Sequence, residues 1–173
     1  SPAGRSACSK PMMGSRATRL APDALPHEDT MNAAPPLPLE DYPLKARDTI
    51  RYADTDRQGH VNNAAFATFC ESGRVAFLVD PTRPLAPPGT AFVIARLVLD
   101  FRAELNWPGH VDIGTRVLKV GRSSLTLAQG LFQNGRCAAT AESVCVLMDE
   151  STRRATPLLD AVATRLQTLM TAR

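Results

Sequence analysis

Residues 54–63, which read DTDRQGHVNN, hold the densest group of side chains that could take part in chemistry. Asp54, Asp56 and His60 each offer a carboxylate or an imidazole. A strongly apolar pattern with helical spacing follows at once. The segment is therefore expected to place this chemistry at the N-terminus of a helix. An Asp at such a point is either a helix cap or a carboxylate directed at a ligand.

The same residues allow other interpretations. Asp54 is favoured as a carboxylate that stabilises the turn or caps the helix. Asp54, Asp56 and His60 could instead bind a metal together, but two carboxylates and one imidazole with no further His nearby make a poor zinc site. Neither a metal nor another cofactor is therefore expected.

The helix after this segment is predicted to be buried. Its apolar residues recur at intervals of three and four, as on one face of a helix. These residues are Phe66, Phe69, Cys70, Gly73 and Phe77. Asn62 or Asn63 can cap the first turn, because a side-chain oxygen there accepts a hydrogen bond from an unpaired N–H group.

Five segments have the pattern of strands. They span residues 44–52, 92–105, 111–120, 124–132 and 136–148. The connector that contains Asn134 and Gly135 carries a hairpin signal. A strand, a long buried helix and a four-stranded meander indicate an α+β fold, in which a curved antiparallel sheet wraps one central helix. A short C-terminal helix is predicted within residues 158–169.

Composition and charge exclude several classes of protein. The net charge of +3 is too small for the basic face of a nucleic-acid-binding protein, although it favours an anionic small ligand. No apolar run approaches the roughly 20 residues of a membrane span, so a cytoplasmic protein with no membrane partner is expected. The four cysteines lack CxxC spacing and are expected to be free thiols.

The chain is predicted to contain one domain with an extension before it. Residues 1–41 are rich in Pro, Ala, Ser and Met and lack periodicity, so they are predicted to be disordered. The domain is expected to span residues 42–173. One helix cannot cover every strand, so the open sheet edge and the remaining apolar surface predict pairing with a second copy. A homodimer with a continuous sheet, or a homotetramer of two such dimers, is expected.

Residues 43–169 resemble the hotdog-fold acyl-CoA thioesterases of the 4-hydroxybenzoyl-CoA thioesterase type. The resemblance rests mainly on the DTD and GHVNN segments of residues 54–63, followed by the aromatic Phe66 and by Glu71 and Arg74 in the helix. It implies a hotdog fold and the hydrolysis of an acyl-CoA thioester to a free acid and coenzyme A. An acyl-carrier-protein thioesterase and a non-catalytic acyl-CoA binding or sensing protein remain alternatives.

The resemblance assigns catalytic roles to three residues. Asp56 matches the catalytic carboxylate of the family, as a nucleophile or as a general base on water. Asn63 matches the residue whose backbone N–H polarises the thioester carbonyl, a role that suits the positive end of a helix dipole. His60 is expected to orient Asp56, to hydrogen-bond the acyl group or the water, or only to stabilise the turn.

The resemblance also suggests residues that bind the substrate. The turn of Arg122, Ser123 and Ser124 offers a guanidinium and hydroxyl groups to the phosphates of coenzyme A, but it could be only a tight turn. Asn62 and Phe66 are further predicted substrate-binding residues. A helical glutamate is catalytic in a second branch of the family. Glu71, however, is better explained by an ion pair with Arg74, three residues along the helix.

Overall fold

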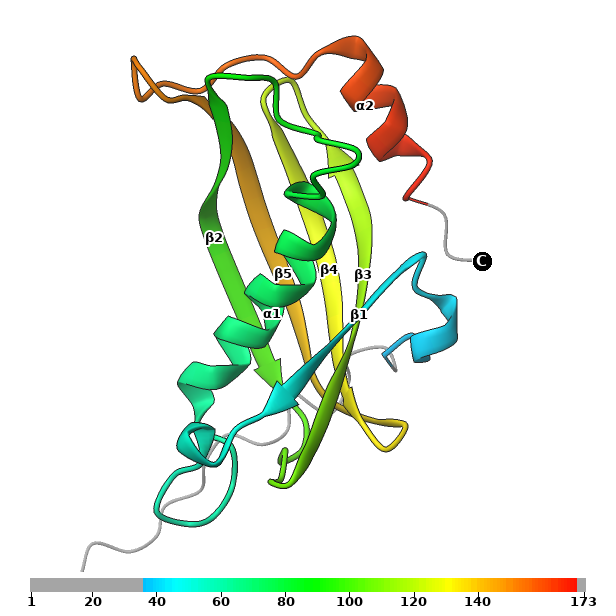
Figure 1. Ribbon diagram of the computed structural model, residues 1–173. Helices are drawn as coiled ribbons and strands as arrows, with labels where there is room; N and C mark the ends of the chain where they lie inside the picture. Colours follow the sequence, from blue (N-terminus) through cyan, green and yellow to red (C-terminus); the bar gives the residue numbers. More distant parts are fainter. Residues whose placement is uncertain (1–35, 171–173) are drawn as a thin grey trace, which may run out of the picture. The chain divides into compact units, whose positions relative to one another are not determined.

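A computed structural model describes residues 36–170 of the chain (Figure 1). A five-stranded antiparallel sheet and one long helix form most of this part. The strands are β1 (Leu44–Ile50), β2 (Thr90–Phe101), β3 (Gly109–Val120), β4 (Ser124–Gln133) and β5 (Arg136–Asp149). The helices are α1 (Asn63–Leu78) and α2 (Asp160–Gln167), with short 3-10 helices η1 (Leu39–Asp41) and η2 (Tyr52–Asp54). The predicted α+β hotdog arrangement is confirmed.

The predicted elements agree with the observed ones to within a few residues, except at the end of the second strand. That strand was predicted to continue to residue 105, but β2 ends at Phe101. The N–H groups of Arg102 and Ala103 both donate to the carbonyl oxygen of Ala138, so the regular ladder stops there. The predicted disordered extension falls largely on residues 1–35, which lie outside the described residues.

The sheet has the strand order β1-β3-β4-β5-β2, so β1 and β2 are its two edges. Helix α1 lies across one face of the sheet (Figure 1). Its buried residues Phe66 and Phe69 pack with Ile113 of β3 and Leu131 of β4 in one core cluster. Full burial of each large apolar side chain is worth about 1.5–3 kcal/mol. This core fixes α1 against the middle of the sheet.

A polar contact inside the core sets the position of α1 along the sheet. The side-chain amide of Gln129, buried on β4, donates to the carbonyl oxygen of Cys70 at 3.0 Å and to Thr115 Oγ1 at 3.1 Å. Arg74 donates in turn to Gln129 Oε1 at 3.3 Å. The helix comes this close because it has Gly73 here, where a Cβ would stand 2.7 Å from the Gln129 amide nitrogen.

The hairpin between β4 and β5 has the turn that its sequence predicts. Asn134 and Gly135 have φ values of 52° and 77°, the left-handed conformation that two-residue hairpin loops require. Within residues 36–170, Cys70, Cys137 and Cys145 are free, as expected from their spacing. No helix in this part of the chain is long and apolar enough to cross a membrane.

Candidate active site

The loop from β1 to α1 is closed by its own backbone hydrogen bonds. The N–H of Asp56 donates to the carbonyl oxygen of His60 at 2.8 Å, and the N–H of Gly59 donates to that of Asp56 at 3.1 Å. Gly59 has a φ of 87°, which a residue without a Cβ adopts at little cost. The N–H of Val61 donates to Leu105, which ties the loop to the segment after β2. The loop therefore presents Asp56 just before the first turn of α1.

Asp54 has a structural position in this loop. Its carboxylate oxygen Oδ2 accepts from the N–H of Arg51 at 2.7 Å. Its carbonyl oxygen accepts from the N–H of Asn62 at 2.8 Å. Asp54 thus joins the beginning of the loop to its end, as its interpretation as a turn carboxylate predicted.

Asn62 is the N-cap of α1. Its Oδ1 accepts from the N–H of Ala64 at 2.9 Å, so this oxygen is used by the helix, and only the side-chain NH₂ is left for a substrate. The next residue, Asn63, is the first of α1. Its backbone N–H has no hydrogen-bond partner among the described residues. The helix N-terminus therefore keeps a free donor at the position predicted to hold the oxyanion.

Asp56 and His60 have different partners. Asp56 Oδ1 accepts from the N–H of Gln58 at 2.7 Å, while its Oδ2 has no partner within residues 36–170. His60 Nε2 lies 3.3 Å from Oε2 of Glu104, and Glu104 follows β2 in the chain. The sequence did not single out Glu104, because nothing in the local pattern links it to a loop more than forty positions away. No hydrogen bond joins His60 to Asp56 in the described part of the chain.

A hollow of about 290 Å³ brings four of the predicted residues together at the N-terminus of α1. Asp56, His60, Asn63 and Phe66 all line it. The opposite wall consists of the last residue of β2 and the three residues after it. These are Phe101, Arg102, Ala103 and Glu104. Phe66 packs edge-to-face on Phe101 with ring centroids 5.1 Å apart. A carboxylate, an imidazole and a helix N-terminus therefore share one space with an aromatic wall.

The turn that contains Arg122, Ser123 and Ser124 is not part of this hollow. It joins β3 to β4, at the end of the sheet away from the Asp56 loop (Figure 1). The length of β3 separates the two ends by roughly 36 Å. Two backbone carbonyls of the turn, those of Arg122 and Ser123, accept hydrogen bonds from Leu158 and Leu147. A single chain therefore does not bring this turn to Asp56.

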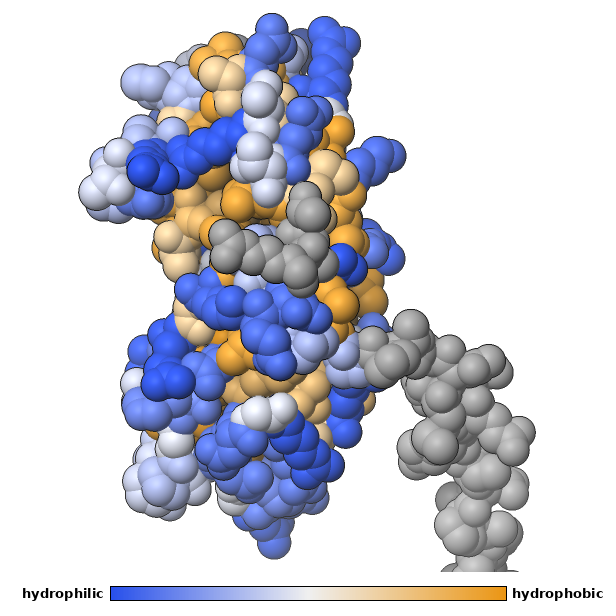
Figure 2. Space-filling model, turned by 90° about the vertical axis from the view of Figure 1, so that its right-hand side faces the viewer, coloured by the Kyte–Doolittle hydropathy of each residue, from blue (hydrophilic) through white to orange (hydrophobic). Residues whose placement is uncertain are grey.

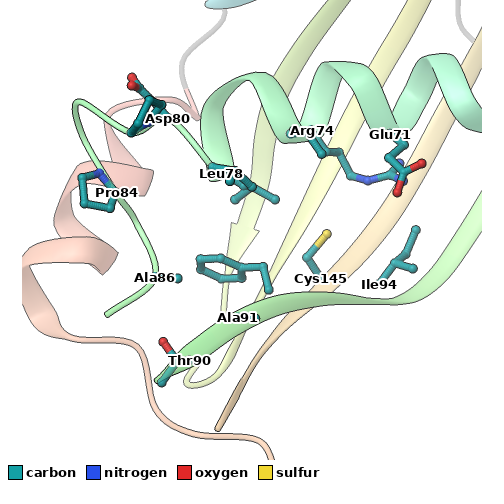
Figure 3. A pocket seen from close by; sticks show the side chains of 14 residues that line it. Glu71, Arg74, Leu78, Asp80, Pro84, Ala86, Thr90, Ala91, Ile94 and Cys145 are labelled. Carbon is teal, nitrogen blue, oxygen red and sulfur yellow. The ribbon is translucent and has the colours of Figure 1, made fainter. Parts of the chain in front are cut away.

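A larger cavity of about 460 Å³ lies between the second half of α1 and the first half of β2 (Figure 3). Glu71 and Arg74 both line it, but the predicted ion pair between them is wrong. The ion pairs within residues 36–170 are Arg47–Asp112, His60–Glu104 and Arg96–Glu142. Arg74 is buried and turns toward the Gln129 amide, whereas Glu71 is exposed.

No group of three or more His, Cys, Asp or Glu side chains in residues 36–170 is arranged to hold a metal ion. The sequence profile of the thioesterase-like superfamily matches residues 50–166. This range includes the Asp56 hollow, the whole sheet after β1 and most of α2. No curated protein matches the chain.

Several solved structures have the same fold. A thioesterase from Thermus thermophilus, complexed with coenzyme A and Zn, is 30% identical with a TM-score of 0.66, over 76% of this chain and 96% of that one. A predicted thioesterase from Bacillus stearothermophilus is 27% identical, with a TM-score of 0.67 over 75% and 98% of the two chains. The DHNA-CoA thioesterase from Staphylococcus aureus is 21% identical, with a TM-score of 0.65 over 73% and 91%.

Proposed function

Because this chain belongs to the thioesterase-like superfamily and is a thioester hydrolase, we propose that it hydrolyses acyl-CoA thioesters, with Asp56 as the catalytic carboxylate. The observation that carries the proposal is the hollow that Asp56 and Asn63 line together. A free carboxylate oxygen and a free helix N–H are the two groups that hydrolysis of a thioester needs. The coenzyme A bound to the relative from Thermus thermophilus supports coenzyme A as the carrier.

In the proposed reaction, water attacks the thioester carbonyl carbon while Asp56 Oδ2 accepts a proton from it. The N–H of Asn63 and the positive end of the α1 dipole stabilise the oxyanion that forms. When the intermediate collapses, the C–S bond breaks, and the sulfur of coenzyme A takes the proton from Asp56. The products are the free acid and coenzyme A.

A second route begins with direct attack of Asp56 on the carbonyl carbon. The C–S bond then breaks to give a mixed anhydride and a thiolate, and water hydrolyses the anhydride. Single-turnover hydrolysis in heavy-oxygen water distinguishes the routes. Label enters the Asp56 carboxylate only if Asp56 is the nucleophile and water attacks its carbon.

We further propose a homodimer paired through β2. The side chains of Ile94 and Phe101 on this edge strand are 48% and 50% exposed, and Val75 and Val79 on α1 are also exposed. The other edge is less suited to pairing, because β1 carries Lys45, Arg47 and Asp48, and charged residues protect an edge. On that side, polar side chains interrupt the apolar surface (Figure 2).

Pairing through β2 also explains the separation of the two predicted substrate-binding regions. Two copies of β2 paired antiparallel around a two-fold axis bring opposite ends of the two sheets together. The turn of Arg122 in one subunit then lies at the same end as the Asp56 hollow of the other. A dimer is the smallest assembly that does this, and a tetramer could contain two such dimers. Sedimentation analysis of the purified chain measures which assembly forms.

The test of the function is release of free thiol from a panel of acyl-CoA thioesters. Asp56→Asn is expected to fold normally and to lose at least about a hundredfold in rate, the scale of a lost acid–base group. Asp160→Asn, an exposed aspartate at the start of α2, is the matched control and keeps full activity. Unchanged turnover in a well-folded Asp56→Asn variant contradicts the assignment.

The same panel, extended to acyl-carrier-protein thioesters, tests the choice of carrier. We expect a higher kcat/KM for the coenzyme A thioesters. Faster turnover of the carrier-protein thioesters would instead assign the enzyme to that carrier. Binding without thiol release on every member would indicate an acyl-CoA sensor.

A further inference from the structure

The Asp56 hollow and the 460 Å³ cavity lie at different points along α1. The hollow lies between the start of α1 and the end of β2, and the cavity lies between the second half of α1 and the start of β2. Asn63 and Arg74 are eleven positions apart on α1, which is roughly 16 Å along the helix axis. An acyl chain that lies along α1 with its thioester at Asn63 therefore reaches the cavity.

The cavity walls are mainly apolar. Val75, Leu78 and Val79 line it from α1, and Ala91, Phe92 and Ile94 line it from β2. Val75, Val79 and Ile94 also belong to the exposed surface proposed above for pairing, so the cavity opens toward the proposed dimer interface. Such walls fit the hydrocarbon part of an acyl group, because ligand pockets are lined mostly by apolar side chains with a few polar groups that fix orientation. Arg74 is the cationic group among these walls (Figure 3).

The guanidinium of Arg74 is buried without an acidic partner. The residue is only 7% exposed, and its one hydrogen bond within residues 36–170 is to the neutral Gln129 Oε1 at 3.3 Å. None of the ion pairs in this part of the chain includes it. A buried charge is costly unless an opposite charge pairs with it. Arg74 therefore offers the cavity a buried guanidinium that an anion could neutralise, although Glu71 and Asp80 also line this cavity.

The charge of Arg74 also acts on the cavity wall. Burial raises the pKa of the Cys145 thiol, which lines the cavity, while the positive charge of Arg74 lowers it. Gln129 orients the guanidinium through one nitrogen, and the other N–H donors have no partner among the described residues. A guanidinium with free donors can bind a carboxylate through two parallel hydrogen bonds.

We propose that Arg74 is a specificity-determining residue that binds a carboxylate at the far end of the acyl group. The preferred substrates are then ω-carboxyacyl-CoA thioesters, in which a hydrocarbon chain separates the thioester from a terminal carboxylate. This inference rests on the proposed function, since it assigns the thioester to the Asp56 hollow. Glu71 does not occupy the guanidinium, because it is exposed and forms no ion pair with Arg74.

The experiment compares pairs of acyl-CoA thioesters of equal chain length, one ending in a methyl group and the other in a carboxylate. At the best length, the wild-type enzyme is expected to show a kcat/KM about tenfold or more higher for the carboxylate member, the effect of one charged hydrogen bond. Arg74→Met is expected to lose this preference. Arg83→Met, an exposed arginine outside the cavity lining, is the matched control and keeps the preference.

A second variant and a binding measurement cover the case in which Arg74→Met does not fold. Arg74→Lys keeps the charge but not the planar pair of donors, so it retains only part of the preference. Independently, a free α,ω-dicarboxylic acid is expected to raise the Tm of the wild-type protein more than the monocarboxylic acid of the same length. Arg74→Lys reduces this difference.

Two results overturn the inference and leave thioester hydrolysis intact. One is equal kcat/KM for both members of every pair on the wild-type enzyme. The other is a preference for the carboxylate member that persists in a folded Arg74→Met variant, whether that variant is a dimer or a monomer. Absence of thiol release from every thioester overturns the proposed function instead. The difference in Tm between the two acids then decides the role of Arg74 alone.

Discussion

The two cavities along α1 are built in different ways. At the start of α1, the loop that carries Asp56 is held by hydrogen bonds among near neighbours in the sequence, and its polar groups are largely accessible. At the other end, Arg74 is buried and its hydrogen bond goes to Gln129, 55 positions along the chain. One end has a carboxylate and a helix N-terminus, and the other has a guanidinium that forms no ion pair within residues 36–170.

Because of this difference, the reaction and the recognition of the acyl group are assigned to two separate places along α1. The first end supplies a proton acceptor and an oxyanion donor, which act on any thioester alike. The second end supplies a charge in an apolar cavity, which acts only on an acyl group that carries a matching charge. The core contact among Gly73, Gln129 and Cys70 adjoins the Arg74 end and fixes the helix that both ends share.

The largest expected effect separates the two ends directly. Asp56→Asn is expected to lower kcat at least about a hundredfold for every acyl group in the same proportion, because the reacting carboxylate is lost. Arg74→Met is expected to change the ratio of kcat/KM between carboxylate and neutral acyl groups. Measurement of kcat and KM on the same substrate pairs checks both. If the loss of kcat in Asp56→Asn differed between acyl groups, the two ends would not have separate roles.

The next effect is on stability, and it concerns the packing of α1, the helix that both ends share. Gly73→Ala places a Cβ 2.5 Å from Ile113 Cγ2, so α1 must move away from the sheet. We expect a loss of about 1–3 kcal/mol in the free energy of unfolding, as for other overpacked cores. Urea unfolding measures it, and Thr68→Ala, on the exposed side of α1, is a control expected to change the value by less than about 0.5 kcal/mol. Equal stability of Gly73→Ala and wild type would show that the helix has room to shift.

The third prediction concerns alkaline pH and the core beneath the middle of α1. Burial raises the pKa of Cys70 from 9.0 to about 11, although Arg74 opposes the shift. The unfolded chain ionises at the lower pH, so stability is intact below about pH 9 and falls as the pH rises toward about 11. Cys70→Ala is expected to weaken this fall when urea unfolding is followed across that range. An unchanged slope in Cys70→Ala would assign the alkaline loss to other groups.

The smallest effect is confined to the first end. Asn62→Ala removes the side-chain acceptor for the N–H of Ala64, and loss of an N-cap costs about 1 kcal/mol. We expect lower activity from a frayed helix start and an unchanged preference for carboxylate acyl groups. Asn62→Asp, which keeps a capping oxygen, should restore stability. A changed acyl preference in Asn62→Ala would mean that the two ends are coupled.

Much of this fold could be predicted from local patterns. Alternating apolar residues marked the strands, intervals of three and four marked α1, and Asn134 with Gly135 marked the hairpin, because each signal depends only on near neighbours. The end of β2 was missed, since it depends on Arg102 and Ala103 sharing one distant carbonyl. The structural role of Asp54 was also predicted from the sequence, since its partners are near it in the chain.

The sequence by itself determined the elements, the capped start of α1 and the placement of Asp56 and Asn63 beside each other. Only the tertiary structure decided that His60 faces Glu104, that Arg74 hydrogen-bonds Gln129 and forms no ion pair with Glu71, and that the turn of Arg122 lies at the far end of the sheet. The physical reason is that backbone conformation follows from short-range sterics and hydrogen bonding. The partner of a long polar side chain is chosen by packing among residues far apart in the chain.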